Sequence, residues 1–125
     1  MEDKKILLVI DDDRATLGLY EEVLKGAGYT VTMTPDGQEG LKLAQEGGYS
    51  AILLDIIMPK LDGIGLLTAL KNNPPKKPNG PIVVMTNLSG DPVIKQALNL
   101  GAKECFIKTE VTPDQILEKL AKIVA

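Results

Sequence analysis

The chain has 125 residues, enough for one domain with a substantial hydrophobic core. Its net charge of −3 and short basic pairs disfavour nucleic-acid binding, which requires clustered Lys and Arg. A single Cys excludes an internal disulfide and is typical of a reducing compartment. No apolar run approaches the ~20 residues of a membrane span, and the first residues lack a signal-peptide layout. We therefore expect a cytoplasmic protein that binds neither nucleic acid nor membrane.

Apolar runs alternate with segments of helical period along the whole chain. Strands are expected at 6–10, 29–33, 51–54, 82–85 and 105–107. Helices are expected around 17–27, from Asp36 to about Gln45, over 64–71, from Pro92 behind the cap Asp91 to a stop at Gly101, and after the capping-box pattern 112–115. The sequence therefore predicts five βα units.

The strands are unbroken apolar runs, which are typical of a parallel sheet with both faces covered by helices. We predict an α/β fold with a five-stranded, doubly wound parallel sheet. No repeat, low-complexity tract or linker interrupts the sequence, so we expect one domain over 1–125 without an output domain. In such sheets ligands lie beyond the carboxyl ends of the strands.

Polar residues follow four of the predicted strands at these carboxyl ends. Asp11 and Asp12 follow the first strand, Asp55 closes the third, Thr86 follows the fourth and Lys108 follows the fifth. Adjacent carboxylates repel one another unless a cation is present, and Mg²⁺ prefers oxygen ligands. A carboxylate at the end of a buried strand is also costly unless its charge is used. The sequence therefore predicts a site for a divalent cation and a phosphoryl group.

Each of these residues has a simpler explanation when it is taken alone. An Asp after a strand commonly caps a helix, and we expect Asp13 to be a cap or a surface residue. By itself, Asp55 fits a turn, Thr86 a strand end and Lys108 a solvated surface position. Their common position at one edge of the sheet favours the functional interpretation.

The whole pattern resembles the receiver domain of two-component response regulators, in particular single-domain regulators of the chemotaxis type. The resemblance covers essentially all residues, and its most specific motif is LLDIIMPKLDG at 53–63. It implies a flavodoxin-like strand order, 2-1-3-4-5. It also implies that Asp55 accepts a phosphoryl group from a sensor histidine kinase or a histidine phosphotransfer protein. Carboxylates do form such acyl-phosphate intermediates.

The resemblance also assigns a role to each residue of the site. The Mg²⁺ ligands would be Asp11, Asp12, Asp55 and the backbone carbonyl of Ile57. Lys108 would neutralise the phosphoryl charge, and the Thr86 hydroxyl would donate to a phosphoryl oxygen. Such a protein is not a turnover enzyme but a phosphoacceptor switch that catalyses its own phosphorylation and dephosphorylation. Ile57 and Leu88 flank the path of a hydrolysing water and cannot orient it, so we expect slow dephosphorylation.

Three positions depart from the family pattern. Cys105 stands where receivers usually carry Tyr or Phe, so a rotating aromatic ring is absent there. Asn87 stands where a small residue is typical, and it narrows the phosphoryl pocket or adds a hydrogen-bond donor. Thr109 replaces the usual Pro after Lys108, so we expect a trans bond, because a cis bond without Pro costs about 2.5–4 kcal/mol.

The segment 92–101 has more apolar residues than one buried stripe requires, including Ile94 and Leu98. Either the helix is well buried or it presents an apolar patch to a partner. The resemblance implies that a downstream protein binds the face formed by this helix, the last strand and the last helix. With Asn87 and Cys105, Ile94 and Leu98 are candidates for the switch surface of a monomer or weak dimer.

Three other functions remain as alternatives. A receiver-like module that binds partners without phosphorylation would explain the altered residues Asn87, Cys105 and Thr109. A haloacid-dehalogenase-like phosphatase would use Asp11 and Asp13, but its pattern requires Thr at the position of Ala15. A flavin carrier shares the fold, but its phosphate would need a cradle of Ser, Thr and Gly where this chain is acidic. The five strand-end residues favour the switch over all three.

Overall fold

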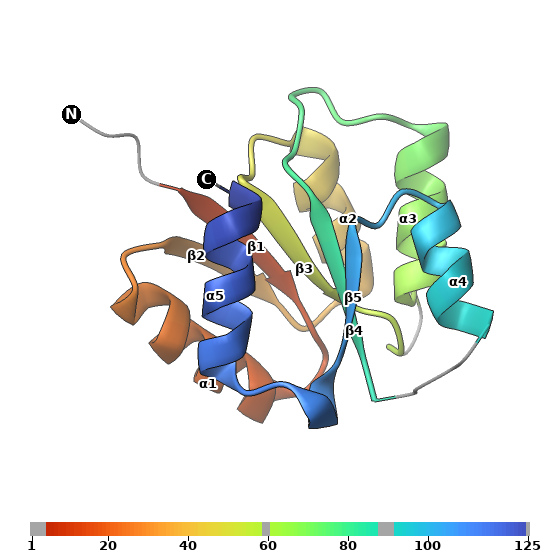
Figure 1. The fold of residues 1–125 in the computed structure, drawn as a ribbon. Coiled ribbons are helices and arrows are strands. Elements are labelled where there is room, and N and C mark those ends of the chain that lie inside the picture. Colours follow the sequence, from red (N-terminus) through yellow and green to blue (C-terminus); the bar gives the residue numbers. More distant parts are fainter. Residues whose placement is uncertain (1–4, 59–60, 88–91, 125) are drawn as a thin grey trace.

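Strands and helices alternate along the chain in the computed structural model, which describes residues 5–58, 61–87 and 92–124 (Figure 1). The strands are β1 (Ile6–Ile10), β2 (Thr30–Thr34), β3 (Ala51–Asp55), β4 (Ile82–Thr86) and β5 (Glu104–Ile107). The α-helices are α1 (Arg14–Gly26), α2 (Gly37–Glu46), α3 (Gly63–Asn72), α4 (Pro92–Asn99) and α5 (Pro113–Val124), and a short 3-10 helix, η1 (Lys108–Glu110), follows β5. Within these ranges no helix is both long and apolar enough to cross a bilayer. The predicted cap Asp91 lies outside the described residues, as do Pro59, Lys60 and Leu88.

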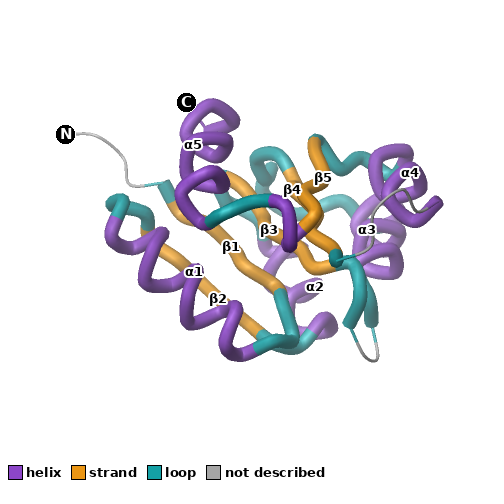
Figure 2. The backbone as a smooth tube through the Cα atoms, turned by 60° about the horizontal axis from the view of Figure 1, so that its bottom comes forward, coloured by secondary structure: helices purple, strands orange, loops and turns teal. Residues whose placement is uncertain are grey.

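The five strands form one parallel sheet in the order β2-β1-β3-β4-β5, which confirms the predicted topology. The strand order reverses between β1 and β3, so the loops after these two strands lead to opposite faces of the sheet. In the register, Asp55 pairs with Met85 and Thr86 pairs with Ile107. Figure 2 turns this carboxyl-end edge toward the viewer. The sheet therefore brings the ends of β1, β3, β4 and β5 to one side.

Helices cover both faces of the sheet, as the apolar strands predict. Helices α1 and α5 lie on one face, and α2, α3 and α4 lie on the other (Figure 1). Alternate residues of the central strands point to opposite cores: Leu8 and Ile52 pack beneath α2 and α3, whereas Leu7 and Leu53 pack beneath α1 and α5. These four side chains are completely buried, so they hold the strand ends of the candidate site in a fixed register.

Carboxylate and hydroxyl side chains cap the helices that adjoin the site. Asp13 accepts a hydrogen bond from the Ala15 N–H at 3.1 Å, which confirms its expected role as the cap of α1. The capping box before α5 is also confirmed. Thr112 N–H donates to Gln115 Oε1 at 2.8 Å, and Gln115 N–H donates to Thr112 Oγ1 at 3.2 Å.

Only part of the apolar surface of α4 is accessible. Ala97 is completely buried, and Val93 and Leu100 pack against the core beneath the helix. Ile94 is half-buried, and Leu98 is exposed at 43%. The helix therefore buries one face, and its accessible apolar surface centres on Leu98 and the exposed part of Ile94.

The loop between α3 and β4 (residues 73–81) is fastened to the opposite, amino-end edge of the sheet. Asn79 Nδ2 donates to the Ala44 carbonyl at 2.9 Å, and Asn79 Oδ1 accepts from the Tyr49 N–H at 3.1 Å. The Gly80 N–H donates to the Tyr49 carbonyl at 2.7 Å. A Cβ on Gly80 would lie 1.7 Å from the Ser50 carbonyl oxygen, so only glycine permits this approach. The sequence predicts a loop here but not these contacts.

Replacement of Gly18 by Ala should raise the free energy of unfolding by about 1 kcal/mol. Gly18 lies in the middle of α1 and is exposed. A Cβ added at this position would have no other described atom within 4 Å, so it would meet open space. Alanine is the better helix former because its backbone loses less entropy on folding. Urea denaturation of both proteins measures the difference.

Gly40 in α2 provides the matched control, because its Cβ would lie 2.7 Å from Cδ1 of the buried Ile10. Gly40→Ala should therefore destabilise the protein despite the same gain in helix propensity. Equal effects of the two substitutions would contradict the packing described here.

Candidate functional site

Two carboxylates are buried at the carboxyl-end edge of the sheet. Asp11 directly follows β1 and is 0% exposed, and Asp55 ends β3 and is 6% exposed. Of the described residues, these are the only buried acidic side chains. Burial of a carboxylate is costly unless charge or hydrogen bonds compensate it. Two buried carboxylates at the switch point therefore indicate a functional site, not two unrelated surface carboxylates, which is the position that the sequence predicts for such a site.

Lys108 compensates both buried carboxylates. It begins η1 directly after β5, and its Nζ lies 2.6 Å from Asp11 Oδ2 and 3.3 Å from Asp55 Oδ2. Burial would lower the pKa of Lys108, but the hydrogen bond to Asp11 and the charge of Asp55 outweigh it, so the pKa is raised. The lysine is therefore a fixed cation between the two acids. The sequence indicates its proximity to Asp55 but not its shorter contact with Asp11.

The pKa of Asp55 is raised to about 6. Burial is the largest cause, and the charge of Asp11 adds to it. Lys108 and the hydrogen bond from the Ile57 N–H, at 3.3 Å, partly offset this rise. Asp55 is therefore a carboxylate at which additional positive charge is favourable.

A third carboxylate completes an acidic cluster. Asp12 is exposed, and one carboxylate oxygen from each of Asp11, Asp12 and Asp55 lies within 4.8 Å of the others. Three carboxylates and one ammonium leave two negative charges unbalanced. A divalent cation with a preference for oxygen ligands, such as Mg²⁺, fits both the charge and the donor atoms. The predicted ligand set therefore fits this cation.

Asp13, although adjacent in sequence, has a different function. Its Oδ2 accepts from the Thr16 hydroxyl at 2.8 Å, and its Oδ1 accepts from the Ala15 N–H. The hydrogen bond from Thr16 is the largest cause of the lowered pKa of Asp13. Both carboxylate oxygens of Asp13 are thus occupied in capping α1. A haloacid-dehalogenase-like phosphatase would need this carboxylate for its reaction, so its capping role argues against that alternative.

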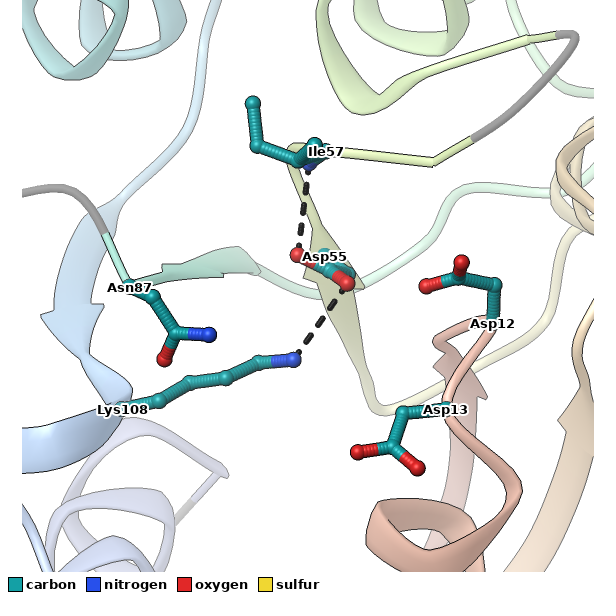
Figure 3. A pocket seen from close by; sticks show the side chains of 6 residues that line it. All are labelled: Asp12, Asp13, Asp55, Ile57, Asn87 and Lys108. Atoms are coloured by element: carbon teal, nitrogen blue, oxygen red, sulfur yellow. Dashed lines mark hydrogen bonds and ion pairs between the residues drawn. The ribbon is translucent and has the colours of Figure 1, made fainter.

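A cavity of about 320 Å³ opens in front of Asp55. Its described lining residues are Asp12, Asp13, Asp55, Ile57, Asn87 and Lys108 (Figure 3). Ile57 is 53% exposed at its rim, and Asn87 is also exposed. Thr86, by contrast, is 1% exposed and is not among these lining residues. The structure thus assembles the predicted acids, the lysine and Asn87 around one opening, with Thr86 buried beside it.

The positions that depart from the family pattern lie close to this edge. Cys105 is half-buried and packs against the core beneath α4, and burial raises the pKa of its thiol. Phe106 points to the opposite face and is buried against α1 and α5, with Lys119 Nζ 5.0 Å from its ring centroid. Phe106 therefore does not replace the aromatic side chain that Cys105 lacks. None of the described peptide bonds is cis, so Lys108–Thr109 is trans, as expected.

An α/β fold with an acidic cluster and a lysine at the switch point defines a phosphoacceptor class of protein. The family model of the response regulator receiver domain matches residues 7–121, and the chain belongs to this family. Receiver domains are phosphoacceptor switches rather than turnover enzymes. They bind Mg²⁺ at an acidic site and interact with histidine kinases or phosphotransfer proteins and with downstream effectors.

Relatives of known sequence are consistent with this assignment. The chain is 36% identical over 125 residues to the uncharacterized transcriptional regulatory protein YkoG of Bacillus subtilis, covering 100% of this chain and 51% of YkoG. It is 30% identical over 107 residues to a probable chemotaxis protein CheY of Rhizobium etli, covering 85% of this chain and 82% of that protein. The chain thus spans about half the length of transcriptional regulators that it matches.

Solved structures share the same fold. A CheY-like receiver domain from Methanospirillum hungatei superposes with a TM-score of 0.83 at 30% identity, covering 98% of this chain and 94% of that one. The receiver domain of the sensor histidine kinase PA1611 of Pseudomonas aeruginosa has a TM-score of 0.81 at 24% identity, covering 98% of each chain. That structure holds a magnesium ion in its active-site cleft.

Proposed function

We propose that Asp55 accepts a phosphoryl group from a phosphohistidine in a Mg²⁺-dependent reaction. The observation that carries this proposal is the pair of buried carboxylates, Asp11 and Asp55, held on either side of Lys108. A purely structural cluster would have no need for a carboxylate that opens into a cavity. The phosphorylated chain then signals through a conformational switch or passes the phosphate on.

In the transfer, a carboxylate oxygen of Asp55 forms a bond to phosphorus as the bond from phosphorus to the imidazole nitrogen breaks. The imidazole leaves with the electron pair. Lys108 Nζ, now 3.3 Å from Asp55 Oδ2, supplies a fixed positive charge to the phosphoryl oxygens, and the Ile57 N–H holds the other Asp55 oxygen. Asp11, Asp12, Asp55 and the Ile57 carbonyl would hold Mg²⁺, which contributes charge neutralisation.

The switch would act through the residues that surround Thr86. Thr86 ends β4 beside Ile107 of β5, and its hydroxyl would move toward the phosphoryl group. Cys105 offers no ring that could follow this movement. We infer that the exposed apolar side chain Leu98 and the accessible part of Ile94 report the change at the α4–β5–α5 face. A downstream protein partner would bind this face of a monomer or weak dimer.

Intact mass measurement tests the proposal directly. The protein is incubated with acetyl phosphate and Mg²⁺, and its mass is followed over hours. A single phosphoryl adduct that requires Mg²⁺ and is absent from Asp55→Asn is the expected result. No adduct and no Mg²⁺ binding would instead support the alternative, a receiver-like binding module that acts without phosphorylation.

Substitution of Ile57 by Asn should accelerate loss of the phosphoryl group by about ten-fold. Ile57 is exposed at the cavity rim, and its side chain cannot hydrogen-bond a hydrolysing water. One well-placed amide hydrogen bond contributes up to about 1.5 kcal/mol, which corresponds to about a factor of ten in rate. The decay of the mass adduct after removal of acetyl phosphate measures the rate.

Ile57→Val is the matched control, because it changes the volume without adding a polar group. Its adduct should decay at the rate of the wild-type protein. Equal decay of the Asn variant and the wild-type protein would contradict the expected slow hydrolysis.

A further inference from the structure

Asn87 is the one uncharged polar side chain among the described residues that line the cavity. It directly follows β4, and its amide points toward the space where Lys108 approaches Asp55 (Figure 3). No hydrogen bond or ion pair joins it to another described residue, whereas Asp13, Asp55 and Lys108 beside it are paired. Its amide is therefore available to a molecule that enters the cavity.

The other lining side chains leave a defined requirement for a hydrogen-bond donor. Three of them, Asp12, Asp13 and Asp55, can only accept hydrogen bonds in their ionised form, and the fourth, Ile57, has no polar side-chain atom. The Lys108 ammonium is directed to Asp11 and Asp55. Phosphoryl transfer replaces the single negative charge of Asp55 with the two charges of an aspartyl phosphate, which increases the demand for donors.

We propose that Asn87 is a catalytic residue whose Nδ2–H donates to a phosphoryl oxygen as the group passes to Asp55. The inference rests on the proposed phosphorylation of Asp55 and identifies a further donor of that site. Because the amide is neutral, it adds two donors without a charge that would pair permanently with the nearby carboxylates. An aspartate at this position would repel the phosphoryl group instead.

The step can be written for acetyl phosphate, which is the probe. An oxygen of the Asp55 carboxylate bonds to phosphorus, the bond from phosphorus to the acetyl oxygen breaks, and acetate leaves with the electron pair. No proton is transferred, and Asn87 remains a neutral amide throughout. Its hydrogen bond strengthens as the leaving acetate exposes the phosphoryl charge, so it lowers the barrier.

A second effect of Asn87 on the rate is steric. Because its side chain lies at the opening of the cavity, it also narrows the path to Asp55. Narrowing alone would predict that a smaller residue speeds phosphorylation, most strongly for a bulky donor. Hydrogen bonding predicts that every residue without a donor slows phosphorylation, whatever its size.

The test compares Asn87→Leu, Asn87→Ala and Asn87→Asp with the wild-type protein. Leucine keeps the branched shape and the number of heavy atoms of the asparagine side chain but has no polar group. Alanine removes both the branched shape and the polar group. Aspartate has nearly the same size as asparagine but replaces the amide donor with an acceptor. Rate constants for formation of the Asp55 adduct are measured with acetyl phosphate and with phosphoramidate. Phosphoramidate is a smaller donor whose leaving group is ammonia. Thermal unfolding and Mg²⁺ affinity are measured for each variant, to separate loss of folding or metal binding from loss of the donor.

The leucine and alanine variants should both react at least about ten-fold more slowly with both donors. The decrease should appear in the maximal rate constant of adduct formation, not in the donor concentration that gives half of that rate. The aspartate variant should be slower still, and the leucine variant should retain wild-type Mg²⁺ affinity. A wild-type rate in Asn87→Leu, or a faster reaction of Asn87→Ala with acetyl phosphate, overturns the role of Asn87. Absence of an adduct in the wild-type protein overturns the proposed function itself, and the role of Asn87 with it.

Discussion

Replacement of Lys108 by Met should reduce the rate of Asp55 phosphorylation by about 100- to 1,000-fold. Among the described residues, Lys108 is the one that forms an ion pair with Asp55, with Nζ at 3.3 Å, and its side chain is largely shielded from water. Preorganised charge of this kind is typically worth a factor of 100 to 1,000 because it needs no reorganisation during the reaction. The rate of formation of the mass adduct with acetyl phosphate and Mg²⁺ measures the effect.

The change must be separated from a loss of stability, because Met leaves Asp11 and Asp55 without their common cation. Loss of one partner of a buried ion pair costs about 3–5 kcal/mol. The rate is therefore measured at a temperature at which circular dichroism shows the variant to be folded. Lys122→Met, the same change on the exposed surface of α5, should react at the wild-type rate. A folded Lys108→Met protein that reacts as fast as wild type would refute the assignment.

Replacement of Asp55 by Asn should stabilise the metal-free protein at neutral pH by about 1–2 kcal/mol. The pKa of Asp55 is raised from 3.8 to about 6, chiefly by burial and then by the charge of Asp11. Between these values the folded state binds more protons than the unfolded state, so stability falls as the pH rises. The ionised form is thus disfavoured by about 3 kcal/mol above pH 6. The lost contact with Lys108 reduces the gain on substitution.

The pH dependence gives this prediction its specific form. The advantage of Asn over Asp should approach its full size above about pH 7 and should decline as the pH falls to about 3, where Asp55 is protonated in both states. Urea unfolding between about pH 3 and pH 8 in the presence of a chelator measures it. Mg²⁺ should then stabilise the wild-type protein more than the variant, because the variant has lost one ligand. An Asp55→Asn protein that is less stable than wild type at every pH would show that burial does not disfavour the ionised form of Asp55.

The regular elements of this protein follow from local sequence. The alternation of apolar runs and helical periods predicts five βα units, and strands such as 82–85 are observed within one residue of the predicted end. The capping box before α5 is a local interaction between Thr112 and Gln115, so its sequence pattern suffices to place the start of the helix. The strand-end rule is equally local, and it places Asp11, Asp55, Thr86 and Lys108 at one edge.

Contacts between distant segments are not predictable in the same way. Lys108 has a flexible stem, and the sequence does not decide which neighbouring carboxylate it approaches most closely; the structure places it nearest Asp11. Helical periodicity does not decide how deeply α4 lies, so the partial burial of Val93 and the exposure of Leu98 appear only in the packed molecule. The contacts of Asn79 with Ala44 and Tyr49 join segments more than 29 residues apart in sequence.

The α3–β4 loop is held by hydrogen bonds at the amino-end edge of the sheet, whereas the carboxyl-end edge opens into a cavity. At the amino-end edge, Asn79 and Gly80 join this loop to α2 through a hydrogen bond to Ala44, and to the segment between α2 and β3 through hydrogen bonds with Tyr49. At the other edge, the Asp55 carboxylate faces an open cavity. The amino-end edge is therefore anchored, whereas the edge that carries Asp55 is open. If Asp55 accepts a phosphoryl group as proposed, we expect the loops at the open edge to move while the strands keep their register.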